Sequence, residues 1–307
     1  MIRKTLGVFA LLLLMVLNGT AQPHKSRKYI VDVQAHRGGM GLYPEESLEA
    51  MINAVNLGVN TLEMDLGLTK DKKVVLSHDK YFTHRYTTRP DGTLVQEGDP
   101  KEYIWHMTYD SVAKYDVGLR RNPEMPEQQL IPTPKRLLEE VVATVEAYTK
   151  RNHLEPMNYN IEIKSERDYG GGIEGRDWPE YREFVDVCMP ALDALNLGDR
   201  LIIQSFDTRT LNYINEAYPE HHLAYLIGGG AGTYDEFMGR LNFTPEWLSP
   251  AWTVMNKEMV DRAHADGMKI VTWTVDEKDQ MRSVIDMGVE AVITNYPNRL
   301  LEVVAKY

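Results

Sequence analysis

Along much of the chain, apolar residues spaced as on one face of a helix are followed by a glycine and then by a short apolar run. Glycine readily adopts the left-handed conformation that ends a helix, and strands covered by helices on both faces read as continuous apolar runs. The pattern therefore predicts alternating helices and buried strands, with a left-handed glycine after each helix. It occurs at residues 48–55, Gly58 and 61–66; at 184–195, Gly198 and 201–205; at 259–263, Gly267 and 269–275; and at 281–285, Gly288 and 291–294.

Nine strands are predicted in total. Only residues 67–73 join the second strand to the third, which is too short for a parallel crossover, so these two should form an antiparallel hairpin. The eight strands that remain, with helices between them, predict an α/β fold of the closed (β/α)8 TIM barrel type. A doubly wound open sheet is the alternative. The predicted strands are 32–35, 61–66, 74–77, 160–164, 201–205, 223–227, 247–249, 269–275 and 291–294.

Residues 79–132 match no barrel element. The helix that follows them is predicted to begin with Thr133 as its N-cap and Pro134 in its first turn. A connection of this length in a compact domain is usually functional or a small subdomain. We expect it either to fold over the site and influence what is bound there, or to pack its aromatic side chains against the barrel. Those side chains are Tyr81, Phe82, Tyr86, Tyr103, Trp105, Tyr109 and Tyr115.

The first 21 residues have the pattern of a cleaved signal peptide. Arg3 and Lys4 precede an apolar run over 6–17 that is too short to span a bilayer. Gly19 and Ala21 are the small residues expected before a cleavage site. We therefore expect a mature protein of residues 22–307 that is secreted or periplasmic and has no stable membrane anchor. An uncleaved amino-terminal anchor is the alternative.

Composition and charge narrow the class of protein. Hydrophobic residues make up 43% of the 307 and charged residues 26%, which excludes disordered and fibrous classes. The formal charge of -11 argues against a nucleic-acid partner, because phosphate backbones are bound by clustered Lys and Arg. The single cysteine, Cys188, has no partner for an internal disulfide, and we interpret it as a packing residue. The oligomeric state is left open.

Charged side chains gather where the predicted strands end. In a barrel of parallel strands these ends meet at one mouth, where active sites form. Because side chains alternate along a strand, Glu63 and Asp65 face one way with Met64 opposite, and Glu162 shares a face with Lys164. Three carboxylates at one mouth would repel one another without a cation, and an all-oxygen ligand set favours Ca²⁺ or Mg²⁺. The sequence therefore predicts a metal site.

Two histidines and two cations complete the predicted site. His36 and Arg37 follow the first strand, and His78 ends the hairpin strand. Imidazole titrates near neutral pH, so a histidine on each side of a metal-bound group suits general acid and general base catalysis. Arg37 and Lys164 would supply positive charge to phosphate oxygens. Together these residues predict metal-assisted phosphoryl transfer on a small-molecule substrate.

These residues also resemble the glycerophosphodiester phosphodiesterase family, and the resemblance covers residues 32–301. The specific part is the amino-terminal signature, which the chain matches in order and spacing. That signature comprises Ala-His-Arg-Gly-Gly at 35–39, Tyr-Pro-Glu-Glu-Ser at 43–47, Leu-Glu-Met-Asp at 62–65, Leu-Thr-Lys-Asp at 68–71 and Val-Val-Leu-Ser-His-Asp at 74–79. Weaker matches are Ile-Glu-Ile-Lys at 161–164, Gln-Ser-Phe at 204–206, Trp-Thr-Val at 273–275 and Ile-Thr-Asn-Tyr-Pro at 293–297.

The resemblance implies a TIM barrel with a small insertion after the second barrel strand, corresponding to residues 79–132. It implies hydrolysis of glycerophosphodiesters to glycerol 3-phosphate and an alcohol. In the implied mechanism one histidine deprotonates the glycerol 2-hydroxyl, which attacks phosphorus, the other protonates the departing alcohol, and a cyclic phosphate then opens with water. Which histidine has which role stays open. The implied site comprises His36 and His78 for catalysis, Glu63, Asp65 and Glu162 for a divalent metal, and Arg37, Lys164, Gln204 and Trp273 for the substrate and its phosphate.

The chain departs from the family pattern at two places. Glu46 and Ser47 stand where Asn-Thr is usual, and Lys72 stands where glycine is frequent. Both lie beside the site, so they bear on substrate fit more than on activity. Three other functions remain as alternatives: glycoside cleavage by paired carboxylates, which needs neither Arg37 nor two histidines; a secreted barrel that binds a phosphorylated ligand without turnover; and a lysophospholipase D-like activity.

Overall fold

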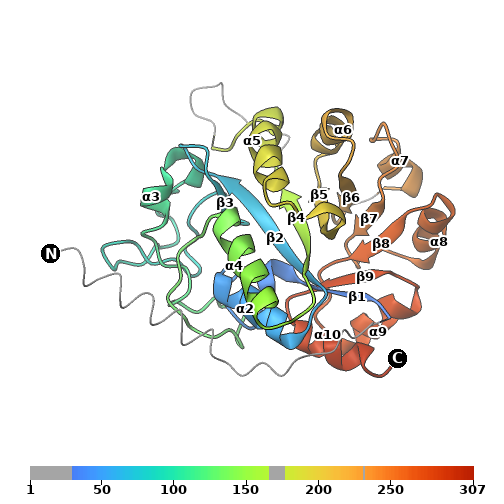
Figure 1. Cartoon of the computed structure of the whole chain (residues 1–307), viewed down its shortest axis with the longest axis horizontal. Helices are drawn as coiled ribbons and strands as arrows, with labels where there is room; N and C mark the ends of the chain where they lie inside the picture. Colours follow the sequence, from blue (N-terminus) through green and yellow to red (C-terminus); the bar gives the residue numbers. More distant parts are fainter. Residues whose placement is uncertain (1–29, 166–176, 231) are drawn as a thin grey trace.

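The structure, a computed structural model, describes residues 30–165, 177–230 and 232–307, and the predicted signal peptide lies outside them. Within this described part, eight parallel strands form a closed ring at the centre of the molecule (Figure 1). The ring closes because the first strand pairs with both the second and the last. The TIM barrel is therefore confirmed, and the open sheet is wrong. Its strands are β1 (Asp32–Ala35), β2 (Thr61–Leu68), β4 (Asn158–Ile163), β5 (Leu201–Ser205), β6 (His222–Ile227), β7 (Trp247–Pro250), β8 (Lys269–Thr272) and β9 (Ala291–Thr294).

Helices surround the ring, and glycine ends three of the four that the pattern singled out. Gly58, Gly267 and Gly288 follow their helices with φ of 86°, 82° and 94°. Gly198 also has a positive φ, but α5 ends earlier, and the chain turns at Asn196 (φ 55°) before Gly198 begins the short helix η3 (Gly198–Arg200). The prediction of a glycine cap is therefore wrong at α5. The helices around the ring are α2 (Leu48–Leu57), α4 (Leu138–Arg151), α5 (Tyr181–Asp193), α6 (Thr208–Ala217), α7 (Tyr234–Met238), α8 (Lys257–Ala265), α9 (Lys278–Asp286) and α10 (Pro297–Val304).

Helix α4 begins at Leu138, later than the predicted start at Thr133 and Pro134. Just before this start, Arg136 and Leu137 pair with the hairpin strand β3 (Val74–Leu76). Leu76 donates its amide to the Arg136 carbonyl at 2.9 Å, and Leu137 forms a bridge with this strand. Thr133 does not cap a helix; its hydroxyl donates to Glu49 Oε2 at 3.1 Å. Pairing with β3 therefore makes the helix begin several residues after the capping signal at Thr133 and Pro134.

The predicted hairpin is confirmed, because β3 pairs antiparallel with β2. After β3, residues 79–132, which we name the insertion, form the short helices η2 (Ile104–His106) and α3 (Tyr109–Val112). Figure 1 shows α3 at the left of the molecule. The insertion has a small core of its own, with Phe82 stacked on Tyr115 at a centroid distance of 3.9 Å. The buried residues of this core are Val75, Phe82, Tyr86, Ile104, Val112 and Val117.

Amide side chains form a hydrogen-bonded file inside the barrel. Asn160 Nδ2 donates to Gln34 Oε1 at 2.9 Å and to Gln204 Oε1 at 3.2 Å, and the three side chains are fully or almost fully buried. Gln34 Nε2 donates in turn to Asp32 Oδ2, and Gln204 Nε2 to Glu63 Oε1, each at 2.9 Å. This amide file therefore joins a carboxylate at the base of the barrel to one at the mouth. A separate apolar cluster, Ala224, Trp247, Val271, Ala291 and Ile293, comes from the strands β6 to β9.

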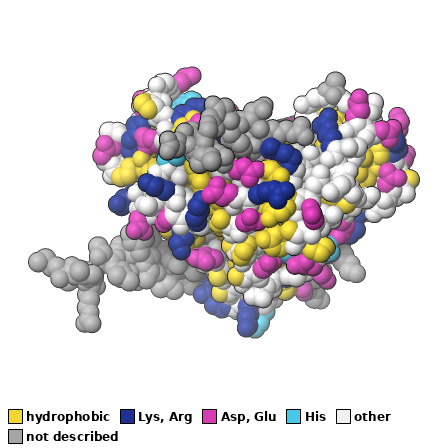
Figure 2. Space-filling model, turned by 90° about the horizontal axis from the view of Figure 1, so that it is seen from above, with side chains coloured by type: hydrophobic (Ala, Val, Ile, Leu, Met, Phe, Trp, Pro, Cys, Tyr) yellow, Lys and Arg dark blue, Asp and Glu magenta, His cyan; other side chains and the backbone are white. Residues whose placement is uncertain are grey.

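On the face shown in Figure 2, basic and acidic side chains lie interspersed and form no single large patch of one sign. Among the described residues, no helix has both the length and the apolar character needed to span a membrane. Cys188 lies fully buried in α5, in the core between the helices and the barrel, which agrees with a packing role.

Candidate active site

The first strand leads into a tight turn, η1 (His36–Gly38), which presents two site residues side by side. Arg37 has a left-handed backbone, with φ of 50°, and its amide donates to Glu63 Oε2 at 2.9 Å. Gly38 follows with φ of 81°, and a Cβ there would lie 2.8 Å from the Cβ of Ala50 in α2. Only glycine fits this close approach, so the turn depends on it.

Three buried carboxylates converge at the mouth. Glu63 and Asp65 lie on β2, and Glu162 lies on β4, where it is the register partner of Asp65. One oxygen from each lies within 4.8 Å of the others, and the three residues are 2%, 1% and 6% exposed. Asp65 Oδ2 has no hydrogen-bond partner among the described residues. The donor atoms are all oxygens, which is the set that hard divalent cations select.

Two cations flank the carboxylates. Arg37 Nε lies 3.2 Å from Asp65 Oδ2. Lys164 lies just beyond the end of β4, with its Nζ 3.1 Å from Glu162 Oε1 and 3.6 Å from Asp65 Oδ1. Both cations are therefore held by the cluster and lie beside the space that a bound anion would occupy.

Burial and repulsion perturb the acids of this cluster. Burial, reinforced by Asp65, raises the pKa of Glu63 well above its usual value. Burial also raises the pKa of Glu162 to about 7, although Lys164 opposes the shift. At Asp65, burial is outweighed by positive neighbours, Lys164 foremost, which hold its pKa below the ordinary range. The cluster therefore holds more acid than Arg37 and Lys164 neutralise, and a further cation would relieve it.

His36 is held by a neutral partner from the other end of the chain. Its Nδ1 lies 2.6 Å from Asn295 Oδ1, and Asn295 Nδ2 donates to Asp276 Oδ2 at 2.7 Å. The amide oxygen of Asn295 therefore faces the ring, so Nδ1 carries the proton and Nε2 has a free lone pair. That Nε2 lies 4.0 Å from Glu63 Oε2. Burial, with Arg37 nearby, lowers the pKa of His36 to about 3, which keeps the ring neutral.

His78 follows β3 and is held by a charged partner. Its Nδ1 lies 2.9 Å from Asp79 Oδ1, and Asp79 Oδ2 lies 3.3 Å from Arg85 Nη2. Although burial acts to raise the pKa of Asp79, the hydrogen bond with His78 holds it below its usual range. The ionised Asp79 accepts a hydrogen bond from His78 Nδ1 and so orients the imidazole ring. The two histidines therefore have partners of different charge.

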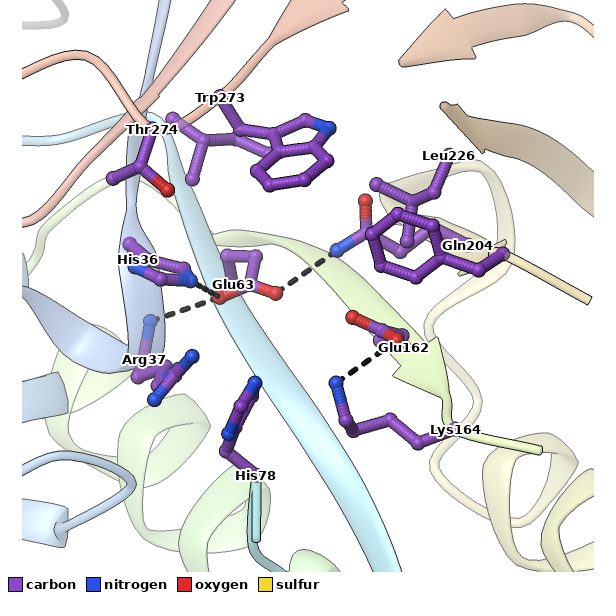
Figure 3. Close-up of a pocket in the computed structure, with 12 residues that line it drawn as sticks. His36, Arg37, Glu63, His78, Glu162, Lys164, Gln204, Leu226, Trp273 and Thr274 are labelled. Atoms are coloured by element: carbon purple, nitrogen blue, oxygen red, sulfur yellow. Dashed lines mark hydrogen bonds and ion pairs between the residues drawn. The ribbon is translucent and has the colours of Figure 1, made fainter. Parts of the chain in front are cut away.

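A cavity of about 150 Å³ opens between these groups (Figure 3). Figure 3 shows His36, Arg37 and His78 on one side and Gln204, Glu162 and Lys164 on the other, with Glu63 between them. Gln204 donates to Glu63 from β5, and the Trp273 indole is held by a hydrogen bond to the Ser249 carbonyl at 2.9 Å. Asp65 does not line the cavity itself but forms ion pairs with two residues that do, Arg37 and Lys164. The lining residues are His36, Arg37, Glu63, His78, Glu162, Lys164, Gln204, Phe206, Leu226, Trp273, Thr274 and Ile293.

Comparison with known proteins shows the family of the chain. The model of the glycerophosphoryl diester phosphodiesterase family matches residues 36–299. The chain belongs to this family. A glycerophosphodiester phosphodiesterase of Caldanaerobacter subterraneus subsp. tengcongensis is 29% identical over 274 residues, which cover 89% of this chain and 98% of the relative. As a member of the family, the chain is an enzyme, a phosphoric diester hydrolase that acts on glycerophosphodiesters.

Two further proteins are similar to this phosphodiesterase, one in sequence and one in structure. Lysophospholipase D of Mus musculus is 27% identical over 322 residues, which cover 97% of this chain and 94% of the relative. A phosphodiesterase of Oleispira antarctica, solved in complex with the product sn-glycerol-3-phosphate, superposes with a TM-score of 0.67. It is 19% identical and covers 90% of this chain and 97% of its own, so it supports the shared fold.

The two departures from the family pattern have structural explanations. Lys72 has φ of 59°, in the left-handed region that glycine adopts most easily. Glu46 is buried, and its Oε1 accepts the amide of Asp65 at 2.9 Å. Burial raises the pKa of Glu46, and its side chain is one methylene longer than that of the usual asparagine.

Several site residues were not singled out from the sequence. Asn295 and Asp79 orient the histidines, and Asn160 supports Gln204 from inside the barrel. Asn295 and Asp79 lay within the motifs already quoted, Asp79 directly after His78, so their positions were visible although their roles were not. Asn160 shares a face with Glu162 by the alternation of side chains along the strand, so its direction was readable, but its partners Gln34 and Gln204 lie on other strands and were not readable. Its role became visible only when the ring closed.

The insertion contributes no residue to the lining of this cavity. Of its aromatic side chains, Phe82 and Tyr86 are buried in its own core, and Tyr115 packs against that core. Tyr81 meets Tyr103 edge to face at 5.7 Å. These rings pack within the insertion, whereas Trp105 packs against the main core of the barrel. Packing against the barrel is therefore seen for Trp105, and an influence on what is bound stays a prediction.

Proposed function

We propose that Glu63, Asp65 and Glu162 bind one divalent cation, Ca²⁺ or Mg²⁺, and that the hydrolysis depends on it. The residues fit such an ion: each offers a buried carboxylate oxygen, and Asp65 Oδ2 lacks a hydrogen-bond partner among the described residues. When bound, the ion supplies positive charge that stabilises the developing charge on a phosphate and polarises its oxygens. Arg37 and Lys164, on either side of the cluster, bind the remaining phosphate oxygens.

We assign His36 as the general base and His78 as the general acid. His36 Nε2 has a free lone pair because Nδ1 donates to a neutral amide, so it accepts the proton of the glycerol 2-hydroxyl. That oxygen attacks phosphorus within the same molecule and displaces the alcohol oxygen. His78, whose Nδ1 is held by Asp79, acts as the acid and donates a proton from Nε2 to this oxygen. In the second step water attacks the cyclic phosphate, and the two histidines exchange roles.

The observation that carries this proposal is the unequal pairing of two histidines on either side of the three carboxylates. The remaining predicted residues support it: Gln204 orients Glu63, and Trp273 forms an apolar wall that suits the glycerol carbons. The test is release of glycerol 3-phosphate from a panel of glycerophosphodiesters, with and without added metal. We expect release only with metal. Release of the free alcohol without glycerol 3-phosphate would overturn the assigned products.

A lysophospholipase D-like activity is the second candidate. It is favoured by the similarity to the mouse enzyme and by the exposed Phe206, whose ring meets Trp273 edge to face at 5.4 Å at the cavity rim. An acyl chain would find apolar surface there. Lysophospholipids belong in the same panel, because preference for them over water-soluble diesters would establish this activity. Equal or lower rates on every lysophospholipid would reject it.

We also propose that the chain is exported and matured by loss of its first 21 residues. The support is the order of basic pair, apolar run and small residues at the amino terminus. Sequencing the amino terminus of protein recovered from the secreted or periplasmic fraction tests this, with Gln22 as the expected first residue. Recovery of the chain in the cytoplasm with Met1 intact would contradict it.

A further inference from the structure

The insertion reaches the active site through two adjacent residues. Arg85 and Tyr86 do not line the cavity, but each contacts a carboxylate that in turn holds a residue of the site. One carboxylate, Glu45, follows the first barrel strand, and the other, Asp79, follows the hairpin. The insertion therefore contacts both sides of the mouth from behind.

Tyr86 acts on the side of Arg37. Its hydroxyl donates to Glu45 Oε1 at 2.9 Å, and Arg37 Nη1 donates to the same oxygen at 3.2 Å. The three residues are 3%, 6% and 9% exposed, so water does not replace either donor. Burial raises the pKa of Tyr86, which keeps its proton available for donation. Glu45 Oε2 has no hydrogen-bond partner among the described residues, so two donors on one oxygen orient this carboxylate.

Arg85 acts on the side of His78. Its Nη2 lies 3.3 Å from Asp79 Oδ2, while Asp79 Oδ1 accepts from His78. Its Nη1 donates to Glu124 Oε2 at 2.9 Å, a carboxylate further along the insertion. The guanidinium is therefore held between the insertion and the site, and it fixes the carboxylate that orients the imidazole.

The insertion is stiff enough for this task because Tyr86 belongs to its buried core. Backbone pairing ties that core together: the amide of Thr88 donates to the Asp116 carbonyl at 2.8 Å, and the reverse bond measures 3.0 Å. Groups that orient a binding or catalytic residue are effective when their own position is fixed by packing.

We propose that Arg85 and Tyr86 are positioning residues, with Tyr86 aligning the Arg37 guanidinium toward the phosphate and Arg85 aligning the His78 imidazole toward the departing oxygen. The insertion then assembles the mouth of the barrel, a task distinct from the choice of alcohol. This inference rests on the proposed roles of Arg37 and His78.

The first test compares Tyr86→Phe with Tyr115→Phe. Each change removes one hydroxyl that donates to a carboxylate, but Tyr115 donates to Glu102 within the insertion and not toward the site. We expect Tyr86→Phe to raise KM for a glycerophosphodiester about tenfold with little change in kcat, because Arg37 loses its alignment. Tyr115→Phe should match the wild type. Equal effects of the two changes would overturn the role of Tyr86.

The second test compares Arg85→Gln with Arg89→Gln. Arg89 binds Asp99 and Glu102, both inside the insertion. We expect Arg85→Gln to lower kcat roughly 10- to 100-fold with KM unchanged, and Arg89→Gln to have no such effect. With the p-nitrophenyl ester of glycerol 3-phosphate, whose leaving group departs without protonation, the loss at Arg85→Gln should largely disappear. A loss of equal size on both substrates would overturn the role of Arg85.

Arg37→Ala and His78→Ala complete the series and separate two kinds of failure. If these variants keep wild-type kinetics, the proposed function of the site is wrong. If they lose activity while Tyr86→Phe and Arg85→Gln behave like their controls, the site stands and the positioning inference fails. Thermal unfolding of every variant accompanies the kinetics, and a kinetic defect counts only where the melting temperature lies within a few degrees of wild type. For a variant that melts lower, kinetics at a reduced temperature at which it is folded replace the first measurement.

Discussion

Charged side chains line both ends of the barrel, and they are arranged in opposite ways. At the base, a cavity of about 330 Å³ is bordered by charges in close pairs. Arg200 makes two contacts of 2.8 Å with Glu146, and Lys269 Nζ lies 2.9 Å from Glu246. At the mouth, three carboxylates share two cations.

The contrast indicates what distinguishes a functional site from a polar surface of similar composition. Both ends hold buried or half-buried acids, histidine and cations, so the number of charges does not separate them. The mouth differs because like charges are held together by strands that cannot move apart. At the base, Arg200 is paired with Glu146 and Lys269 with Glu246, and the buried acid Asp32 is held by hydrogen bonds from Gln34 and Thr61. A functional site is therefore indicated where the fold holds like-charged side chains together without enough counter-ions to neutralise them.

Removal of metal should have the largest effect of any change and should act only at the mouth. Chelation is expected to abolish hydrolysis, with recovery on addition of Ca²⁺ or Mg²⁺. Glu63→Gln should behave like the chelated enzyme in excess metal and should lose the metal-dependent rise in melting temperature. Lys269→Gln, at the base, should keep the full metal response. Full activity in excess EDTA, with the metal content measured as nil, would contradict the metal site.

Loss of either site histidine should have the next largest effect. His36→Ala and His78→Ala should each lower kcat by roughly 10² to 10⁴, the usual contribution of a positioned acid or base. The matched control is His222→Ala, because His222 is paired with Glu246 at the base. Steady-state kinetics on one glycerophosphodiester should show no change in kcat for the control. A wild-type kcat in His36→Ala or His78→Ala would remove that residue from the mechanism.

Lys164→Ala at the mouth, compared with Lys269→Ala at the base, tests the lysines of the two ends. The expected effect on KM is smaller than the effects of the preceding changes. Loss of a charged donor to the phosphate should raise KM by about 10- to 100-fold, equivalent to roughly 1.5 to 3 kcal/mol. Lys269→Ala removes an ammonium of the same kind at the base and should leave KM unchanged. If KM is unchanged in both, Lys164 serves only its ion pair with Glu162.

Asp32→Asn should change stability and leave kinetics unaltered. Burial, opposed by hydrogen bonds from Gln34 and Thr61, raises the pKa of Asp32 to about 6. A raised pKa in the folded state means that the folded protein holds this proton more tightly, so stability falls as pH rises from about 4 to about 6. The variant should therefore be more stable at pH 8 by roughly 1 to 3 kcal/mol. Urea unfolding at pH 4 and pH 8 measures this, and an equal gain at both would exclude the titration.

Features set by local periodicity could be predicted from the sequence. The hairpin followed from the shortness of residues 67–73, and the convergence of Glu63 with Asp65 followed from alternation along one strand. The start of α4 could not be predicted, because Arg136 and Leu137 are drawn into pairing with β3 by tertiary contact. Local capping signals at Thr133 and Pro134 had no information about that strand.

The candidate site divides in the same way. Most of the charged residues that line the cavity lie in short motifs, so their chemistry is readable one strand at a time. Their partners are distant: Asn295 lies 259 positions from His36, and Tyr86 lies 41 from Glu45. Tyr86 was noted only as part of an aromatic surface, since its hydroxyl acquires a role only when the insertion packs. In this protein, the orientation of the site residues depends on contacts between residues that are far apart in the sequence.

In the amide file inside the barrel, the direction of hydrogen-bond donation reverses at one residue, Asn160. Asn160 donates in both directions, so every donor points outward, toward Asp32 at one end and Glu63 at the other. Turning any single amide over would bring two NH₂ groups or two carbonyls face to face, and the file consequently admits one arrangement. At its upper end, both oxygens of Glu63 already accept a hydrogen, one from Gln204 and one from the Arg37 amide. The barrel thus orients Glu63 to donate an electron pair before any ligand arrives. Asn160→Asp would remove the amide group that donates to both Gln34 and Gln204, so the side chains of these two glutamines could then rotate.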